Sequence, residues 1–199
     1  MVGYYLNTKL PVIETKRLLL REIRLSDCED MFEYACLPGF GPMAGWQPHR
    51  TVGETRSIIQ LFLDKKKFGQ LGTFAVVLKE TNKMIGTLEL HTYFRGFKAE
   101  LGYSINPKYQ GNGYATEAAM EAIIWGFEDL GLARIECSTY THNFSSQKVC
   151  KKLNFNYEGT RKKGYQLYDG SLHDLKCYAL TEDDYFSMKY QKFIEDFKK

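Results

Sequence analysis

A glycine-rich turn at residues 110–116 carries the spacing with the clearest chemical meaning in this sequence. Gln110, Gly113 and Ala115 fit the pattern Q-x-x-G-x-[GA], with a second glycine at Gly111. A strand-like segment precedes the turn, and a long helical segment follows it. Backbone N–H groups converge in such a turn, and the helix adds roughly half a positive charge at its first turn. The sequence therefore predicts an anion cradle, and a diphosphate is the expected occupant.

Four further side chains that could take part in chemistry lie outside this turn. Asn143, Ser146 and Cys150 stand at i, i+3 and i+7, so they share one helical face. Glu100 lies at the start of the strand before the turn. Simpler structural roles remain open for three of them, namely Asn143 as a helix cap, Ser146 as an ordinary helix hydroxyl and Glu100 as a surface charge.

Alternating strands and helices must position these groups. Hydrophobic spacing predicts strands at 14–24, 73–78, 84–91, 98–105, 134–139, 155–161 and 172–180. Five helices are expected. The first spans 28–37, the second begins at Thr51, the third spans 115–130, the fourth runs from Asn143 or Ser145 to Leu153, and the fifth begins at Thr181. We expect one helix to be capped by Ser26 and Asp27 and another by Thr51. Two later helices are expected to end at Gly131 and Asn154. The many glycines and prolines of 38–50 predict a loop, with no helix or central strand.

These elements predict a mixed α/β (α+β) fold with a largely antiparallel central sheet. Successive strands up to residue 105 form a meander, and a right-handed crossover then places strand 134–139 parallel to 98–105. Small residues on the crossover helix would let it lie close to the sheet; they are Ala115, Ala118, Ala119, Ala122 and Gly126. We expect a single domain over 1–199, with a core at 14–182 and a C-terminal helix at 183–199.

Composition narrows the class of protein and its partners. The net charge of +3 on 199 residues is too small to indicate a nucleic-acid partner. The five cysteines show no C-x-x-C spacing, which favours free thiols in a reducing cytoplasm over a disulfide framework or a metal site. No apolar run approaches the roughly 18 residues of a membrane span, and no secretory leader is expected. We therefore expect a cytoplasmic protein without metal or membrane partner; a homodimer is possible.

The chain resembles the GNAT acetyltransferase superfamily over residues 14–182, and is most similar to the ribosomal-protein N-terminal acetyltransferase (RimJ/RimL-like) branch. One motif is the turn described above with the residues that follow it, Thr116, Glu117 and Ala118. The second motif comprises Asn143, Ser146, Val149, Lys152, Leu153, Asn154 and Phe155, followed by Glu158 and Gly159. Shorter stretches also resemble this branch, namely Trp46, Pro48 and His49, and Asp169, Gly170, His173, Asp174 and Tyr178.

This resemblance implies acetyl-coenzyme A as acyl donor and a primary amine as acceptor. The donor's diphosphate would bind the turn, and its pantetheine arm would pair with a strand splayed away from its parallel neighbour. A bulge at Gly102 is the expected cause of the splay. The residues expected to bind the donor are Tyr103, Ser104, Ile105, Gln110, Gly111, Asn112, Gly113, Tyr114, Ala115, Thr116, Asn143 and Ser146.

The resemblance further implies direct attack of the amine on the thioester. Glu100 is the expected general base, with Glu89 and His91 as alternatives. Ser146 would hydrogen-bond the departing sulfur, and amides of 103–105 would stabilise the oxyanion. Cys150 occupies the position where many GNAT proteins carry a tyrosine acid, so that route is absent here. A nucleophilic Cys150 is disfavoured because no base is paired with it in the sequence.

Two other functions compete with catalysis. A protein of this fold without turnover could sense coenzyme A, and the missing tyrosine at position 150 motivates that alternative. A Rossmann dinucleotide site is disfavoured because the turn follows a meander and lacks G-x-G-x-x-G. The acceptor is not fixed by fold. Aromatic residues of 40–49, together with Tyr165, Tyr168 and His173, are candidates for its pocket wall, although packing is the simpler role for each.

Overall fold

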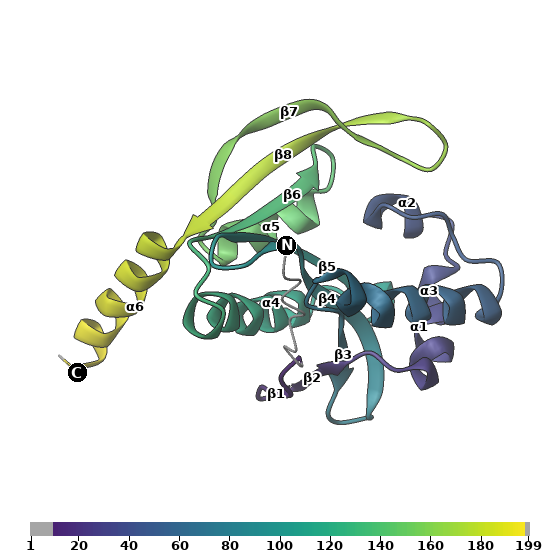
Figure 1. The fold of residues 1–199 in the computed structure, drawn as a ribbon, viewed down its shortest axis with the longest axis horizontal. Coiled ribbons are helices and arrows are strands. Elements are labelled where there is room, and N and C mark those ends of the chain that lie inside the picture. The colour runs from purple at the N-terminus through teal and green to yellow at the C-terminus, as the bar shows by residue number, and fades with distance from the viewer. Residues whose placement is uncertain (1–9, 198–199) are drawn as a thin grey trace.

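A single eight-stranded sheet forms the centre of the computed structural model, which describes residues 10–197 (Figure 1). The spatial order is β1-β2-β3-β4-β5-β6-β8-β7, and of these pairs only β5 with β6 is parallel. The strands are β1 Ile13–Glu14, β2 Leu18–Glu22, β3 Phe74–Leu78, β4 Lys83–Phe94, β5 Lys98–Ile105, β6 Arg134–Tyr140, β7 Asn156–Gln166 and β8 Leu172–Thr181. The predicted mixed fold with one parallel pair is confirmed.

Helices cover both faces of this sheet. They are α1 Cys28–Ala35, α2 Gly41–Ala44, α3 Val52–Asp64, α4 Tyr114–Ile124, α5 Phe144–Lys152 and α6 Glu182–Phe197. Short turns of helix are η1 Leu25–Asp27, η2 Lys65–Phe68, η3 Pro107–Tyr109 and the π-helical η4 Trp125–Asp129. One core cluster joins α1 and α3 to β3, and the other joins α4 and α5 to the opposite face. Within residues 10–197, no helix is both long and apolar enough to cross a bilayer.

Small residues let α4 and η4 lie close to the sheet, as the sequence predicts. Ala118, Ala119 and Ala122 are buried against the sheet. A Cβ on Gly126 would lie 2.8 Å from the Ile135 Cδ1 atom, which is closer than packed carbons approach. The helical segment therefore seats the glycine turn at its start firmly on the strands.

The parallel strands β5 and β6 separate soon after they begin. Their pairing runs only through Lys98↔Arg134, Ala99↔Ile135 and Glu100↔Glu136. Beyond this point β5 stays paired with β4, and β6 stays paired with β8 as far as Tyr140. The two strands therefore form a split that is closed at one end and open at the other, which confirms the predicted splay.

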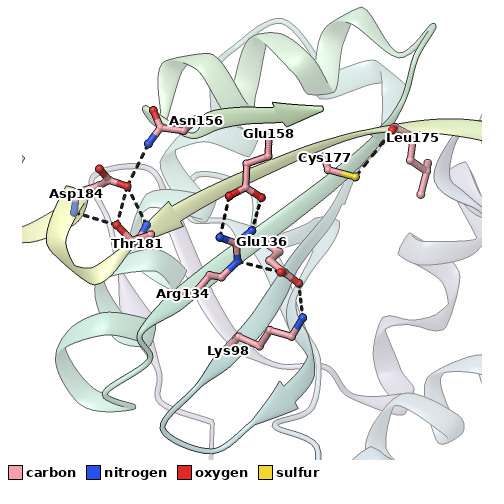
Figure 2. Close-up of polar contacts among 9 residues, drawn as sticks. All are labelled: Lys98, Arg134, Glu136, Asn156, Glu158, Leu175, Cys177, Thr181 and Asp184. Atoms are coloured by element: carbon pink, nitrogen blue, oxygen red, sulfur yellow. Dashed lines mark hydrogen bonds and ion pairs between the residues drawn. The ribbon is translucent and has the colours of Figure 1, made fainter. Parts of the chain in front are cut away.

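Ion pairs lock the closed end of this split (Figure 2). Lys98 Nζ lies 2.9 Å from Glu136 Oε2, and Arg134 Nε lies 2.9 Å from Glu136 Oε1. The Arg134 guanidinium also binds both carboxylate oxygens of Glu158 on β7. Burial raises the pKa of Glu136, but Lys98 and Arg134 outweigh it, so this pKa lies below its usual value. The charged network holds three strands together where the split begins.

The expected strand 14–24 is in fact two strands and a turn. Thr15 N–H donates to Leu18 O at 2.9 Å, so the chain reverses between β1 and β2. The Thr15 hydroxyl also accepts from the Leu18 amide at 2.8 Å. A threonine that bonds its own backbone competes with a continuous strand, which explains the error.

The expectation of an uninterrupted loop at 38–50 was wrong, because α2 forms within it. Proline is tolerated in the first turn of a helix, where its missing N–H has no acceptor, and Pro42 sits there. Gly45 ends the helix with a φ of +92°. This short helix places Met43 and Ala44 beside the open split.

The prediction of a bulge at Gly102 was also wrong. The β4–β5 register is unbroken from Ile105 to Glu100 and shifts only between His91 and Phe94, where Thr92 has a φ of +50°. Gly102 serves another purpose, because a Cβ there would lie 3.0 Å from the His91 ring. The glycine makes room for a side chain that faces the split.

Most element boundaries differ from prediction by a few residues. The strands β4, β7 and β8 run further than expected, and α1 ends two residues early. Asn154 ends α5 in a left-handed conformation with a φ of +59°, as predicted. The predicted domain limits 1–199 include residues 1–9 and 198–199, which lie outside the described residues.

Candidate active site

The glycine turn presents a run of unbonded backbone amides. Before it, the Tyr109 and Gln110 amides are used within η3, and after it Glu117 N–H donates to Gly113 O at 3.0 Å. The amides of 111–116 donate to no acceptor within residues 10–197. Gly111 and Gly113 have φ values of +82° and +81°, which turn successive N–H groups toward one side. These residues line a cavity of about 720 Å³.

Arg17 and Glu117 clamp this turn from behind. Arg17 Nη2 lies 2.6 Å from Glu117 Oε2, and Arg17 Nη1 donates to Asn112 O at 2.9 Å. The guanidinium also lies 4.5 Å from the centre of the Tyr114 ring. Burial raises the pKa of Glu117, but bonds from Thr15 and Arg17 outweigh it and hold this pKa below its usual value. The carboxylate is therefore charged beside the amides, and Arg17 compensates that charge.

This arrangement predicts that Arg17→Leu weakens acetyl-coenzyme A binding about tenfold. The variant leaves Glu117 as an uncompensated charge near the bound anion, and two like charges about 10 Å apart repel by roughly 1.7 kcal/mol at an effective dielectric constant near 20. Adding Glu117→Gln should restore part of the affinity, as isothermal titration would measure. Lys79→Leu, which removes an exposed cation paired with Glu14, is the matched control. A double variant that binds more weakly than Arg17→Leu would contradict the compensation argument.

The edge of β5 that faces the split carries free backbone groups. Asn106 N–H bonds Ile85 O at 2.8 Å, and in an antiparallel pair such bonding alternates along the strand. Ser104 therefore directs its amide to β4, whereas Tyr103 and Ile105 direct theirs into the split. Gln110 Nε2 donates to the Ile105 carbonyl at 2.8 Å and fixes the end of the strand. An extended ligand could pair with Tyr103 as a further strand would.

A second cavity of about 360 Å³ adjoins the first. Both are lined by Met43, Ala44, Tyr103, Asn143 and Ser146. At this junction Tyr103 Oη and Ser146 Oγ lie 2.8 Å apart, and Asn143 Oδ1 accepts from the Ser146 amide at 3.0 Å. Burial raises the pKa of Tyr103, so its hydroxyl keeps its proton.

Glu100 reaches the smaller cavity from the other face of the sheet. Glu100 and Tyr103 are three residues apart on β5 and so point to opposite faces. Both line the smaller cavity, which therefore extends through the split. Glu100 has no hydrogen-bond or ion-pair partner in the described part of the chain, residues 10–197. A free carboxylate thus faces one side of the split, and a pair of hydroxyls faces the other.

Comparison with known proteins identifies the family to which this chain belongs. The model of the acetyltransferase (GNAT) domain matches residues 17–156. The chain belongs to the GNAT acetyltransferases. It is 30% identical to an uncharacterised N-acetyltransferase, p20, of Bacillus licheniformis, covering 88% of this chain and 99% of that protein. It is also similar to the ribosomal protein uS5-alanine N-acetyltransferase of Escherichia coli, at 28% identity over 93% of this chain and 98% of that one.

Solved structures agree with this family. A GNAT-family acetyltransferase from Bacillus anthracis has a TM-score of 0.77 and 28% identity, and the match covers 87% of this chain and 99% of that chain. The match confirms the fold class and the similarity to a GNAT acyltransferase. The RimJ/RimL-like branch predicted from the motifs is also confirmed, since the uS5 enzyme is among the relatives.

Within this GNAT fold, eleven of the twelve residues expected to bind the donor line one or both cavities; the exception is Asn112. Its side chain folds back on the turn and donates to Tyr109 O at 3.1 Å. Ser104 lines the larger cavity, but its hydroxyl lies 2.7 Å from Thr87 Oγ1 in the interior. Its amide also points toward β4, so Ser104 lines the cavity without directing a free hydrogen-bonding group into it. Asn143 caps its helix through Oδ1 and also lines both cavities.

The structure separates the candidate bases of this GNAT acetyltransferase. Glu89 binds Lys65 and accepts from Thr73 Oγ1 at 3.0 Å, and it lines neither cavity. His91 lies opposite Glu100 and lines the smaller cavity. Its Nδ1 atom is 2.9 Å from Thr92 Oγ1. The geometry therefore favours Glu100, with His91 beside it.

Cys150 has no access to either cavity. Its thiol is buried and lies 3.5 Å from the Cys137 Sγ atom. The neighbouring thiol and burial raise the pKa of Cys137, so the Cys137 thiol keeps its proton. All five cysteines are free thiols, and in residues 10–197 no cluster of three acidic, histidine or cysteine side chains could hold a metal. This packing gives a nucleophilic Cys150 no support.

Sequence reasoning missed much of the wall of the smaller cavity. Tyr140 and Arg161 line it from β6 and β7, and no local pattern marks either residue. Tyr165, which the sequence did flag, also lines it and donates to Gly45 O at 3.1 Å. Figure 1 shows the β7–β8 hairpin arching toward α2, and this bond joins the two. Tyr168 and His173 line neither cavity.

Proposed function

We propose that this chain transfers the acetyl group of acetyl-coenzyme A to a primary amine by direct attack. The meeting of two cavities at Tyr103, Asn143 and Ser146, one of them carrying free amides, supports this proposal. The larger cavity suits the donor, and the smaller one suits the acceptor. A peptide N-terminus is a natural acceptor candidate, because the uS5 relative acts on an alanine of a ribosomal protein.

The donor fits the larger cavity by its chemistry. Its diphosphate would accept hydrogen bonds from amides of 111–116 at the start of α4, where the helix dipole favours negative charge. Lys148 and Lys152 line the same cavity from α5 and would attract its remaining phosphate. The amide-bearing pantetheine arm would pair with Tyr103 along the open edge of β5, which leads the thioester to the cavity junction.

Glu100 would accept the proton that the amine must lose. An α-amino group has a pKa of about 7.8 and is partly neutral near pH 7.5, so a weak base is sufficient. Glu100 would take the proton directly or through one water. The amine nitrogen first forms a bond to the thioester carbon, and the C–S bond then breaks as the tetrahedral oxyanion collapses and releases the thiolate of coenzyme A. The amides of Tyr103 and Ile105 would stabilise the oxyanion formed between these events.

Ser146 and Tyr103 would serve the leaving sulfur. Their hydroxyls form a bonded pair at the junction, and Tyr103 retains its proton because burial raises its pKa. Ser146 would donate its proton to the sulfur and take another from solvent, while the Tyr103 hydroxyl holds the Ser146 hydroxyl in place. This pair lies on the opposite face of β5 from Glu100, so proton removal and proton delivery occur on separate sides of the thioester.

We expect Ser146→Ala to lower turnover roughly 10- to 100-fold while the dissociation constant of acetyl-coenzyme A changes less than threefold. Tyr103→Phe should have a similar but smaller effect. Because the two hydroxyls act as one unit, the double variant should lose little more than Ser146→Ala. Steady-state kinetics with titration of the donor would check this. Additive losses would show that the hydroxyls act independently.

The direct test of the proposed function is thiol release with a panel of amines. Peptides beginning with alanine or serine, polyamines and amino sugars would be offered with acetyl-coenzyme A, and the acetylated product would be identified by mass. Release that depends on one amine class supports transfer. Tight donor binding with no release on any amine would contradict it and would favour a coenzyme A sensor.

A further inference from the structure

We propose that the smaller cavity selects amines that also carry an anionic group, and that Arg161 binds this anion. This inference deepens the proposed function and rests on it for the position of the amine. The ligand class is an amine with a carboxylate a few bonds away. A free amino acid and a peptide N-terminus with an acidic neighbour both meet this description.

Two unpaired side chains of opposite charge line this cavity. Glu100 comes from β5 and Arg161 from β7, and neither has an ion-pair or hydrogen-bond partner among residues 10–197. Neighbouring charges on the same hairpin are paired, since Lys162 Nζ lies 2.9 Å from Asp174 Oδ2. His91 is the other titratable side chain in this wall besides tyrosines and Cys137. A cavity with both charges unpaired is complementary to a zwitterionic ligand.

The fold places Arg161 at this cavity through an irregularity in β7. The β7–β8 register shifts between Arg161 and Tyr165, and Lys163 within the shift has a φ of +49°. A Cβ on Gly164 would lie 2.9 Å from both Cγ and Cδ of Arg161, so the glycine leaves space for the arginine stem. This register shift in β7 thus places Arg161 in the wall of the smaller cavity.

Asp174 stabilises the bulge without neutralising Arg161. Its carboxylate accepts from the Lys163 amide at 2.8 Å and from Lys162 Nζ at 2.9 Å. These bonds hold the pKa of Asp174 below its usual value, with the Lys163 amide as the largest cause. The acidic group closest along the hairpin is therefore occupied, and the guanidinium is left for a ligand.

The size and walls of the cavity limit the ligand. About 360 Å³ is at the small end of ligand pockets and accommodates an amino acid or the first residues of a peptide. Tyr140 and Tyr165 form an edge-to-face pair in its wall, with ring centres 5.7 Å apart. Guanidinium binds carboxylate through two parallel hydrogen bonds, and such a pair is stronger where water is partly excluded.

The test compares acceptors of similar size with and without the anion. Alanyl-aspartate amide and alanyl-asparagine amide form one pair, and phenylalanine and phenylalaninamide form the other. We expect kcat/KM for thiol release to favour the anionic member of at least one pair more than tenfold. The first pair tests the peptide source of the carboxylate, and the second tests the free amino acid.

Variants of β7 make the test specific. Arg161→Gln should bring the ratio of kcat/KM for the anionic acceptor to that for the neutral acceptor close to one. Arg161→Glu should make the neutral acceptor the better substrate. Lys163→Gln, which removes a neighbouring exposed cation, should keep the wild-type preference. Equal use of both members by the wild type, or a preference that survives Arg161→Gln, would overturn the inference.

Binding separates this inference from the proposed function. If no acceptor releases thiol, the proposed transfer fails, and the same acceptors would then be titrated into the protein saturated with coenzyme A. Tighter binding of the anionic member that is lost in Arg161→Gln would support the inference without catalysis. Equal binding of both members would overturn it.

Discussion

Gly113→Asp is expected to weaken acetyl-coenzyme A binding by roughly 100-fold or more. Gly113 has a φ of +81° and begins α4, and its nearest neighbour for an added Cβ is Arg17 Nη2 at 3.6 Å. A side chain therefore fits sterically, but the left-handed backbone costs about 1 kcal/mol. A carboxylate a few ångströms from the diphosphate adds a repulsion of about 3 kcal/mol at an effective dielectric constant near 20.

Gly113→Asn isolates the charge from the shape. Asparagine is nearly isosteric with aspartate and tolerates the left-handed conformation, so this variant should lose less than tenfold in affinity. Isothermal titration at two salt concentrations would show that the loss of donor affinity in Gly113→Asp becomes smaller as the salt concentration rises. Equal losses for both variants would mean that backbone shape, and not an anion, decides binding here.

Glu100→Gln is expected to lower kcat by roughly 100- to 1000-fold, which lies in the lower part of the range typical of general acid–base catalysis. The dissociation constant of the donor should stay within about threefold, because Glu100 lines the smaller cavity and not the larger one. The loss of kcat relative to the wild type should become smaller above about pH 8, where an α-amine is mostly neutral even without a general base. A pH–rate profile with saturating donor would measure this.

Glu89→Gln is the matched control for this prediction. Its carboxylate is engaged by Lys65 and Thr73 and lines neither cavity. Turnover should therefore stay within a few-fold of the wild type, while thermal stability falls. A larger loss of turnover in Glu89→Gln than in Glu100→Gln would transfer the role of base to Glu89.

Local patterns predicted the geometry around the glycine turn well. The strand, the glycine turn and the helix follow one another within residues 98–124, so neighbouring residues in the sequence determine their arrangement. Positive φ values at Gly111 and Gly113, the cap at Asn143 and the left-handed Asn154 all follow from residue types whose backbone preferences are strong. The parallel β5–β6 pair followed from the handedness of crossovers.

The smaller cavity and the clamp behind the glycine turn depend on contacts between distant parts of the chain. Tyr165 reaches Gly45 across 120 residues, and Arg17 reaches Glu117 across 100 residues. The position of Arg161 depends on a register shift in β7 that no sequence pattern marks. The Gly102 bulge was predicted from the family, but the ladder shows that this glycine serves the His91 ring. Tertiary packing, and not local preference, decides such features.

A crystal structure of this protein with acetyl-coenzyme A tests the central claim most directly. We predict diphosphate oxygens within about 2.7–3.2 Å of amides of 111–116, the pantetheine arm along Tyr103 between β5 and β6, and the sulfur beside Ser146. A donor bound elsewhere, or these amides satisfied by protein groups while the donor is present, would contradict the account.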